Sequence, residues 1–225
     1  APGDRRVKMS SMRRTIAANM SESLQKTAQL TNITEVDMTR SMELLAARKA
    51  EGISRTALVV RACAIAIREH EIINTVVDGD EIIYKAGIAI GVAVDVPGGL
   101  VVPVIRDAGE KDVLSLSREI AALAERARQG ALSQDELSGG TFTISNQGGI
   151  GGTNFTPVVF WPQAAILGVS RASLEPVYID GELRPRQMLP LALSYDHRIA
   201  DGADAARFVR WVCECIEHPL TMHFD

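Results

Sequence analysis

One stretch of the sequence, Leu193 to Gly202 (LSYDHRIADG), most constrains how the last third of the chain can fold. It continues an apolar run from Met188 to Tyr195 that has the length of a buried strand. The residues after Gly202 repeat apolar positions at helical spacing. His197 is therefore predicted on a short connection between a strand and a helix, where a side chain is held firmly and can still face a cleft.

The polar residues around His197 allow two interpretations. Asp196 and Arg198 flank the histidine and can form local ion pairs, while Asp201 precedes Gly202 at a position suited to capping the next helix. In one interpretation His197 is a catalytic imidazole presented by the turn. In the other His197 only ties down the turn and Asp201 only caps the helix, because the pattern H-x-x-x-D-G is short. Spacing alone leaves both open.

Length and charge limit the classes of protein to which the chain can belong. With 225 residues it can bury a sizeable core, which favours a single domain. The 24 Lys and Arg residues against 28 Asp and Glu give a net charge of -4 with no basic block, which argues against a nucleic-acid partner. Apolar runs are interrupted well before about 18 residues, and the start does not read as a signal peptide, so no membrane partner is predicted. We expect a cytoplasmic protein, or one of the mitochondrial matrix in a eukaryote.

Four residues near the end of the chain have side chains that zinc can bind: Cys213, Cys215, His218 and His223. On a helix, residues two apart point about 200° away from each other, so the two cysteines cannot face one ion. We predict no metal and interpret the cysteines as core residues. The total of three cysteines also argues against a disulfide framework. His70 and His218 close predicted helices, where we expect structural roles.

Hydrophobic periodicity predicts a mixed α/β fold. Helices are predicted at residues 12–26, 41–51, 56–70, 115–128 and 202–218, and strands at residues 30–38, 76–84, 87–96, 100–105, 141–146, 164–170, 177–179 and 188–195, with hairpin turns at Asp78–Gly79 and Asp180–Gly181. This is about eight strands and five or six helices without strict β-α-β alternation. The pattern predicts a large mixed sheet with helices packed on it.

A second candidate side chain lies at the end of a predicted strand. The run TFTISN, residues 141–146, puts Ser145 on the less apolar face and continues into the glycine-rich QGGIGGTN. Glycines let the backbone approach a ligand closely. They do not form a phosphate-binding loop here, because no Gly-Lys-Ser/Thr follows and no G-x-G-x-x-G precedes a helix. Ser145 is the hydroxyl best placed to lie on the floor of a cleft.

From Met9 to about Pro219, the chain resembles the catalytic domain of dihydrolipoamide acyltransferases, the E2 components of 2-oxo-acid dehydrogenase complexes. The resemblance is carried by RRTIAANM, GVAVDVPGGLVVPVIRD, GGTFTISNQGGIGGTNFTPVV, AAILGVS and LSYDHRIADGADAARF, in the family's order. The last motif also resembles chloramphenicol acetyltransferase, which implies a fold like that enzyme's. The opening APGD has linker composition. We expect residues 1–8 to be a linker remnant and residues 9–225 to be the acyltransferase domain of a longer protein.

The resemblance implies a role for each candidate residue. In the family, the histidine of the D-H-R motif is a general base, so His197 would deprotonate the thiol of coenzyme A or dihydrolipoamide, which is mostly protonated at neutral pH. Ser145 would donate a hydrogen bond to the tetrahedral oxyanion. Asp201 would orient the site. The implied substrates are coenzyme A and a lipoyl group carried on a separate domain, with no metal and no acyl-enzyme.

The resemblance also implies an assembly. The family forms trimers in which each site lies between subunits, with the histidine from one chain and the serine from its neighbour, and trimers build a hollow core of 24 or 60 subunits. Other implied partners are the lipoyl domain and, through an upstream region, the E1 and E3 components. The ending HPLTMHFD places Leu220, Met222 and Phe224 at alternate positions. We expect this apolar end to be exposed and to link one trimer to the next.

The sequence departs from the family's pattern at two places. The resemblance implies an arginine partner for Asp201. Ser10-Ser11 stand where many relatives have Thr-Arg, so this partner is expected at Arg13 or Arg14 instead. Phe160-Trp161 stand where relatives often have a small, polar or proline residue. This aromatic pair either fills the core or alters the acyl pocket.

Alternatives within and outside the family remain. The segment SRASLEPVYIDGELRPRQMLPLALSYDHRIADGADAARF looks most like members from pyruvate complexes, which favours acetyl over a branched-chain acyl or succinyl group. A non-catalytic scaffold or core-binding relative would be expected to lack the base, whereas this chain retains His197, Ser145 and Asp201 together. A stand-alone antibiotic acetyltransferase would not need the linker-like start.

Overall fold

A computed structural model describes residues 3–222 of the chain. These residues contain five α-helices: α1 (Ser11–Lys26), α2 (Thr39–Ala47), α3 (Arg55–Glu69), α4 (Val113–Arg128) and α5 (Gly202–Glu217). Short 3₁₀ turns include η2 (Glu71–Asn74), η4 (Asp135–Leu137) and η5 (Pro219–Met222). Throughout this part of the chain, every helix is too short or too polar to cross a lipid bilayer.

Most of the strands form one large mixed sheet. The strands are β1 (Gln29–Asp37), β2 (Thr75–Asp78), β3 (Glu81–Tyr84), β4 (Ile90–Val92), β5 (Val94–Val96), β6 (Gly99–Val101), β7 (Val104–Ile105), β8 (Phe142–Asn146), β9 (Ala165–Val169), β10 (Ser173–Ile179) and β11 (Glu182–Asp196). The sheet has the order β1-β11-β9-β8-β4-β7, and β10 pairs with the first half of β11. β8 runs parallel to β4 and β9, and the other neighbours are antiparallel. The predicted mixed sheet with packed helices is confirmed.

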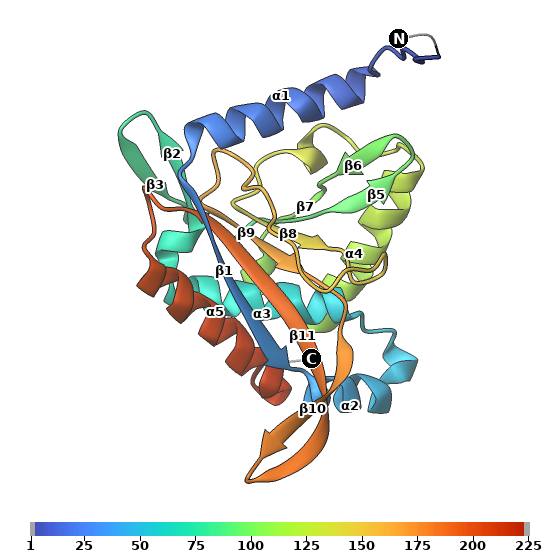
Figure 1. Cartoon of the computed structure of the whole chain (residues 1–225), viewed down its shortest axis with the longest axis vertical. Coiled ribbons are helices and arrows are strands. Elements are labelled where there is room, and N and C mark those ends of the chain that lie inside the picture. Colours follow the sequence, from blue (N-terminus) through green and yellow to red (C-terminus); the bar gives the residue numbers. More distant parts are fainter. Residues whose placement is uncertain (1–2, 223–225) are drawn as a thin grey trace.

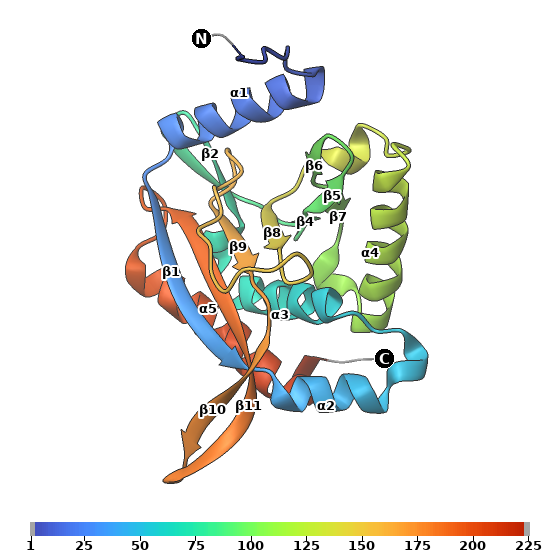
Figure 2. The same ribbon diagram turned by 45° about the vertical axis from the view of Figure 1, so that its right-hand side comes forward.

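The helices surround this sheet, and different elements lie at its two ends. α1 lies across one end of the molecule, and the β10–β11 ribbon projects from the other (Figure 1). Between them, α5 packs on β1 and β11, and α3 packs against both α5 and α4. The turned view shows α4 beside the short strands β5 and β7 (Figure 2). Phe142, Tyr195 and Phe208 are among the largest fully buried side chains of the core.

Local sequence signals account for most of the element ends. The Ser10 hydroxyl accepts a hydrogen bond from the Arg13 N–H at the start of α1, as expected of a helix cap. Gly130 follows the C-cap Gln129 of α4 and has a φ of 67°, the left-handed conformation in which a glycine ends a helix. Asp180 and Gly181 both have positive φ in the predicted hairpin turn between β10 and β11.

Three expectations about strands were wrong in detail. The run 87–96 is not one strand, because it breaks at Ala93, whose N–H donates to the Ile144 carbonyl. β4 before this point joins the large sheet, while β5 after it pairs only with β6. β11 begins at Glu182 rather than Met188, and the described residues hold eleven strands rather than about eight. The extra residues of β11 lie in the projecting ribbon. They are mostly exposed, so no alternation of buried and exposed positions indicates a strand there.

The expectation of an exposed apolar end was also wrong for one residue. Leu220 is 81% exposed, but Met222 is fully buried. The 3₁₀ turn η5 folds Met222 back onto the chain, and the Arg61 guanidinium on α3 donates a 3.0 Å hydrogen bond to its carbonyl. Phe224 lies outside the described residues. Of Leu220 and Met222, only Leu220 therefore exposes its apolar side chain.

Candidate active site

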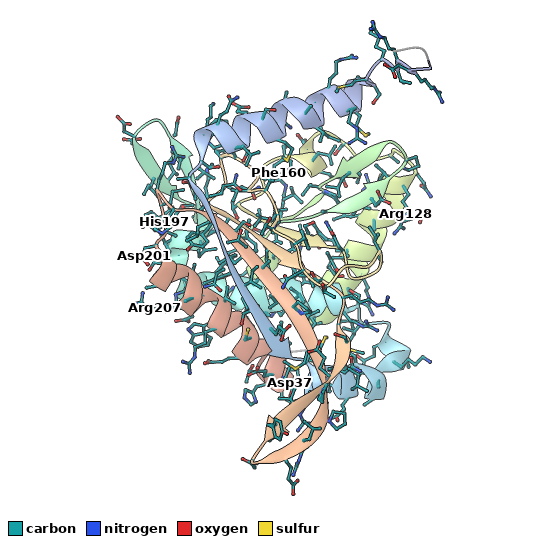
Figure 3. The ribbon with its side chains drawn as sticks, in the orientation of Figure 1. Asp37, Arg128, Phe160, His197, Asp201 and Arg207 are labelled. Atoms are coloured by element: carbon teal, nitrogen blue, oxygen red, sulfur yellow. The ribbon has the colours of Figure 1, made fainter. Side chains whose placement is uncertain are left out.

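His197 occupies the predicted turn between β11 and α5. Its N–H donates a 2.8 Å hydrogen bond to the carbonyl of Ala28, which precedes β1. Its side chain is exposed, and its ring lies 5.8 Å from the buried ring of Tyr195. Figure 3 shows His197 near Asp201 at the start of α5. The backbone of His197 is thus fixed by a residue distant in sequence, while its exposed imidazole can meet a second molecule.

The neighbouring carboxylate of Asp196 holds this turn in place. Asp196 is 1% exposed and accepts hydrogen bonds from the backbone N–H groups of Ala28 and Arg198. The Arg198 guanidinium forms an ion pair with it at 2.6 Å. Burial alone would raise the pKa of Asp196, but the hydrogen bonds from Arg198 and Ala28 outweigh burial and lower it. The predicted local ion pair is confirmed, and the structure adds that its acid is buried.

Asp201 is the N-cap of α5. Its carboxylate accepts hydrogen bonds of 2.8 and 2.9 Å from the N–H groups of Ala203 and Asp204, and Asp204 bonds back to the Asp201 N–H. These backbone hydrogen bonds lower the pKa of Asp201, with a smaller effect from the charge of Arg207. The helix-capping role suggested by the sequence is confirmed.

Within one chain, Arg13 and Arg14, the expected partners of Asp201, bond to other groups. Arg14 donates to the Met9 carbonyl at 2.7 Å, and Arg13 contacts the Gly98 carbonyl at 3.5 Å. Among the described residues, neither forms a hydrogen bond or ion pair with Asp201. Figure 3 shows Arg207 on α5, the helix that Asp201 caps. Arg207 follows the cap Asp201 by six residues, which is less than two turns of α5.

Ser145 lies at the other end of the sheet. It is the fourth residue of β8, half-buried, and pairs across the sheet with Gly168 of β9. Alternation along the strand points Ser145 away from its neighbour Asn146, whose side chain bonds to Thr56 of α3. The glycine-rich segment follows directly, and Gly151 and Gly152 have φ values of 127° and 97°.

The strand register shows that one chain does not bring Ser145 and His197 together. Ser145 is opposite Gly168, and Gly168 is opposite Ala192 of β11. His197 follows Ala192 by five residues, a distance of about 17 Å along the strand at ~3.3 Å per residue. Two strand spacings of ~4.8 Å separate them sideways. A site that uses both residues needs a second chain.

A cavity of about 310 Å³ borders the Ser145 end of the sheet. Its lining includes Arg55, Thr56, Asn146, Gly148 and Ser170. Arg55 is the first residue of α3 and is exposed, so a cation and a helix N-terminus meet at this cavity. Both favour anionic groups such as phosphates. Sequence analysis missed Arg55, whose only local signal was its position after the cap Ser54.

The aromatic pair Phe160-Trp161 lines a larger cavity instead of filling the core. Both side chains are half-buried and border a cavity of about 630 Å³ beneath α1. The Lys26 ammonium lies 3.8 Å from the centre of a Trp161 ring, a cation–π contact that ties the end of α1 to this loop. Figure 3 shows Phe160 below α1.

The cysteines have the environment of core residues. Cys63 on α3 and Cys215 on α5 are buried, and Cys213 is half-buried. Burial raises the pKa of the Cys63 thiol well above its usual range and that of Cys213 to about 12. Thiols held in the protonated form are poor nucleophiles and poor metal ligands.

A family model described as 2-oxoacid dehydrogenases acyltransferase (catalytic domain) matches residues 1–224. This chain belongs to that family. Its sequence is 41% identical over 224 residues to the succinyltransferase component of the mitochondrial 2-oxoglutarate dehydrogenase complex of Saccharomyces cerevisiae, covering 96% of this chain and 48% of that protein. The chain thus spans about half the length of that curated relative.

Solved structures of the family have the same fold. The dihydrolipoamide acetyltransferase of Azotobacter vinelandii matches with a TM-score of 0.94 and 39% identity, over 97% of this chain and 93% of that chain. The cubic core of a pyruvate dehydrogenase multienzyme complex matches with the same score, identity and coverage. Chloramphenicol acetyltransferase matches with a TM-score of 0.60 at 16% identity, which confirms the expected fold and nothing more. Acetyl- and succinyltransferases both occur among the relatives, so family membership does not fix the acyl group.

The Azotobacter vinelandii structure concerns a serine, a histidine and an asparagine and their role in its catalytic mechanism. In that protein the histidine follows the serine by 52 positions, and the asparagine follows the histidine by four. Ser145, His197 and Asp201 are separated by the same 52 and four positions. By spacing, Asp201 of this chain stands where that enzyme has asparagine.

Proposed function

We propose that this domain transfers an acyl group between the dihydrolipoyl thiol of a lipoyl domain and coenzyme A. The observation that carries the proposal is His197: a turn fixed at three points presents an exposed imidazole. Family membership and the shared spacing of serine, histidine and the following Asp or Asn support it. A scaffold without catalysis would have no need of a basic side chain held in this manner.

The chemistry needs one base and one hydrogen-bond donor. His197 takes the proton of the attacking thiol, whose sulfur forms a bond to the thioester carbonyl carbon. The Ser145 hydroxyl donates to the oxyanion of the resulting tetrahedral intermediate. When the intermediate collapses, the other thiolate leaves and takes the proton back from His197. Asp201 positions the His197 turn by fixing the start of α5, and it does not need to exchange a proton.

Two chains share each site in this proposal. Because Ser145 and His197 lie at opposite ends of one sheet, His197 of one chain meets Ser145 of the next. A closed ring of such contacts gives the trimer expected from the family. The arginine-bearing cavity opens at the same end of the sheet as Ser145, on the face toward which Asn146 points, and is suited to the phosphate groups of coenzyme A.

For the acyl group we favour acetyl, on the likeness of residues 170–208 to pyruvate-complex members. The test compares acetyl-CoA with succinyl-CoA as acyl donor to dihydrolipoamide, using the unmodified chain. A higher kcat/KM for acetyl-CoA is expected. Turnover of succinyl-CoA alone would change the acyl group but not the class of reaction, whereas no turnover with either donor, or with branched-chain acyl-CoA, would contradict the proposed activity.

Assembly beyond the trimer is proposed to use Leu220. The exposed Leu220 lies on the rim of an apolar cavity of about 450 Å³ lined also by Leu44, Ala47 and Pro219. A two-fold contact in which each Leu220 enters the partner's cavity would be self-complementary. A point substitution tests this contact better than deletion of residues 219–225, because deletion would also remove the buried Met222.

We predict that Leu220→Asp converts a large particle into trimers of the 24.3 kDa chain that keep their activity. Light scattering gives the mass, and the acyl-transfer assay gives the activity. Met222→Ala is the matched control, because it removes a buried side chain and is expected to cost about 2–5 kcal/mol of stability. A single trimer as the largest species of the unmodified chain at micromolar concentration would contradict this link.

A further inference from the structure

The cavity of about 630 Å³ beneath α1 lies on the same face of the sheet as Ser145. Alternation along β8 puts Thr143 and Ser145 on the face opposite to that of Asn146. The Thr143 hydroxyl donates a 2.7 Å hydrogen bond to the side chain of Gln163, which lines the cavity. The floor of the cavity therefore begins next to Thr143, two residues from Ser145 along the strand.

Apolar groups form the walls of the cavity. Phe160 and Trp161 are half-buried on one side, and Ile16 of α1 borders it as well (Figure 3). On the floor, a Cβ atom at Gly91 would lie only 2.7 Å from Cγ1 of Val102, so this part is closely packed. Each CH₂ group that leaves water for such surroundings favours binding by about 4-fold.

The lining of the cavity is uncharged. Among the residues that the structure describes, none of those bordering it is acidic, basic or a histidine. The Lys26 ammonium near its edge lies over Trp161 and pairs with Glu22 at 2.7 Å. Arg106, at another edge, donates to two backbone carbonyls. A carboxylate in the cavity would find no partner, and an unpaired charge away from water is costly. The cavity therefore suits a neutral chain.

The distance from Ser145 determines which acyl groups reach the cavity. Two residues along a strand span about 7 Å, at ~3.3 Å per residue. An extended chain advances about 1.2 Å per bond, since a residue of three bonds spans at most ~3.6 Å. An acetyl group has a single bond beyond its carbonyl carbon and stops short. A chain that extends about five or six bonds from the carbonyl reaches Thr143.

We propose that the cavity beneath α1 receives the chain of a neutral aliphatic acyl group, so that the protein transfers acyl groups of about six carbons in addition to acetyl. This inference rests on the proposed function, in which Ser145 fixes the position of the thioester carbonyl. The reaction is the same: the acceptor sulfur bonds to the acyl carbonyl carbon, the bond to the coenzyme A sulfur breaks, and His197 carries the proton from one sulfur to the other. Phe160 and Trp161 then determine specificity.

The first test varies the charge at the end of the acyl chain. Hexanoyl-CoA and adipoyl-CoA carry chains of equal length, but adipoyl ends in a carboxylate. With dihydrolipoamide as acceptor, kcat/KM is expected to be higher for hexanoyl-CoA by about 10-fold or more, because the carboxylate would lose water without gaining a partner. Equal values for the two donors, or acetyl transfer without hexanoyl transfer, would overturn the inference.

A variant with a filled cavity tests where the chain binds. Asn19, an exposed residue of α1, borders the cavity, and Asn19→Trp places a ring in it. The ratio of kcat/KM for hexanoyl-CoA to that for acetyl-CoA is expected to fall about 10-fold or more, since several CH₂ groups lose about 4-fold each. Ala18→Trp, at an exposed neighbour outside the lining, is the matched control and is expected to keep the ratio.

An unchanged ratio in Asn19→Trp, or an equal fall in Ala18→Trp, would overturn the inference. In particular, a cavity that holds the arm of the acceptor instead would make both donors lose equally, and the ratio would stay constant.

Tryptophan fluorescence separates this inference from the proposed activity and leaves the cavity unaltered. The chain has two tryptophans, so Trp211→Phe leaves only Trp161. Saturating hexanoyl-CoA is expected to shift the emission of Trp161 more than saturating acetyl-CoA does, because only the longer chain reaches the ring. This shift without transfer of any acyl group would contradict the proposed function alone. Acetyl transfer with equal shifts for the two ligands would overturn the role of the cavity alone.

Discussion

At the His197 end of the sheet, three bonded features fix a short turn, whereas at the Ser145 end the chain leaves the sheet through glycines. Asp196, the Ala28 carbonyl and the Asp201 cap each hold a different part of the first turn. After Ser145, the loop bonds mainly to its own residues: Gly148 to the Asn146 side chain, and Ile150 and Gly151 to the Gln147 carbonyl. Ile150 is 79% exposed.

This difference indicates how the proposed two-chain site would divide its functions. A general base must keep one geometry whatever substrate is bound, and the His197 turn supplies that geometry from a single chain. In the proposed site, the Ser145 hydroxyl and the bound substrates would share the more open end of the sheet, where a neighbouring chain would complete their surroundings. We therefore expect substitutions at the His197 end to lower kcat. At the Ser145 end, we expect some substitutions to lower kcat and others to raise KM.

The largest expected effect is that of His197→Ala. Without a base the attacking thiol remains mostly protonated, so kcat is expected to fall by about 10²–10⁴-fold. Steady-state transfer from acetyl-CoA to dihydrolipoamide measures it, with circular dichroism to verify the fold. His218→Ala, a second imidazole at the end of α5, is the control and is expected to keep turnover. Near-normal turnover of the His197 variant would rule out its role as the base.

Ser145→Ala is expected to lower kcat by about 10²-fold and to leave KM nearly unchanged. The oxyanion exists only after attack, so its hydrogen bond stabilises the transition state and not the bound substrate. The same assay at varied acetyl-CoA separates the two constants. Ser138→Ala, an exposed serine before the strand, is the control. A change confined to KM would make Ser145 a contact to the ground state instead.

Arg55→Ala tests whether substrate binding and catalysis depend on different residues at the Ser145 end. Loss of a charge-assisted hydrogen bond to a phosphate, worth about 1.5–3 kcal/mol, is expected to raise KM for acetyl-CoA about 10-fold or more and to leave kcat unchanged. Arg118→Ala, an exposed arginine on α4, is the control. An equal rise in KM for acetyl-pantetheine, which lacks the nucleotide phosphates, would contradict a phosphate contact.

The sequence predicted the parts of this site that depend on neighbouring residues. The apolar run before His197, the cap Asp201 and the amphipathic helix that follows are local signals, and each corresponds to an observed element. Likewise, the alternation in TFTISN predicted a strand with Ser145 near its end, and Ser145 is the fourth of the five residues of β8.

What the sequence could not provide depends on residues far apart in the chain. Asp196 is buried because the backbone of Ala28, 168 residues away, lies beside it. The separation of Ser145 from His197 follows from the strand order, which no local pattern encodes. Met222 is buried because Arg61 of α3 holds the final turn against the core.

The smallest expected effect is on stability, and it tests how the His197 turn is held. Asp196→Asn keeps the size of the side chain but turns an amide toward Arg198, leaving buried hydrogen-bonding groups unpaired at a cost of about 1–3 kcal/mol. Because His197 would be less firmly positioned, kcat is expected to fall about 10-fold with KM unchanged. Thermal unfolding followed by circular dichroism measures the stability.

The pH dependence of that variant separates the charge of Asp196 from its shape. Folding lowers the pKa of Asp196, so its contribution to stability is fully present above the unfolded value of about 3.9 and is lost as pH falls through the lower folded value. Between pH 7 and pH 5 the difference in Tm between the unmodified chain and Asp196→Asn is expected to stay constant. Below about pH 4 the difference should shrink, because protonation removes the same charge from the unmodified chain. Asp95→Asn, at an exposed carboxylate on β5, is expected to show no such convergence. A difference that persists unchanged down to pH 2 would mean that the carboxylate charge does not hold the turn, and the rigidity of the His197 end would then have to come from the Ala28 carbonyl and the Asp201 cap alone.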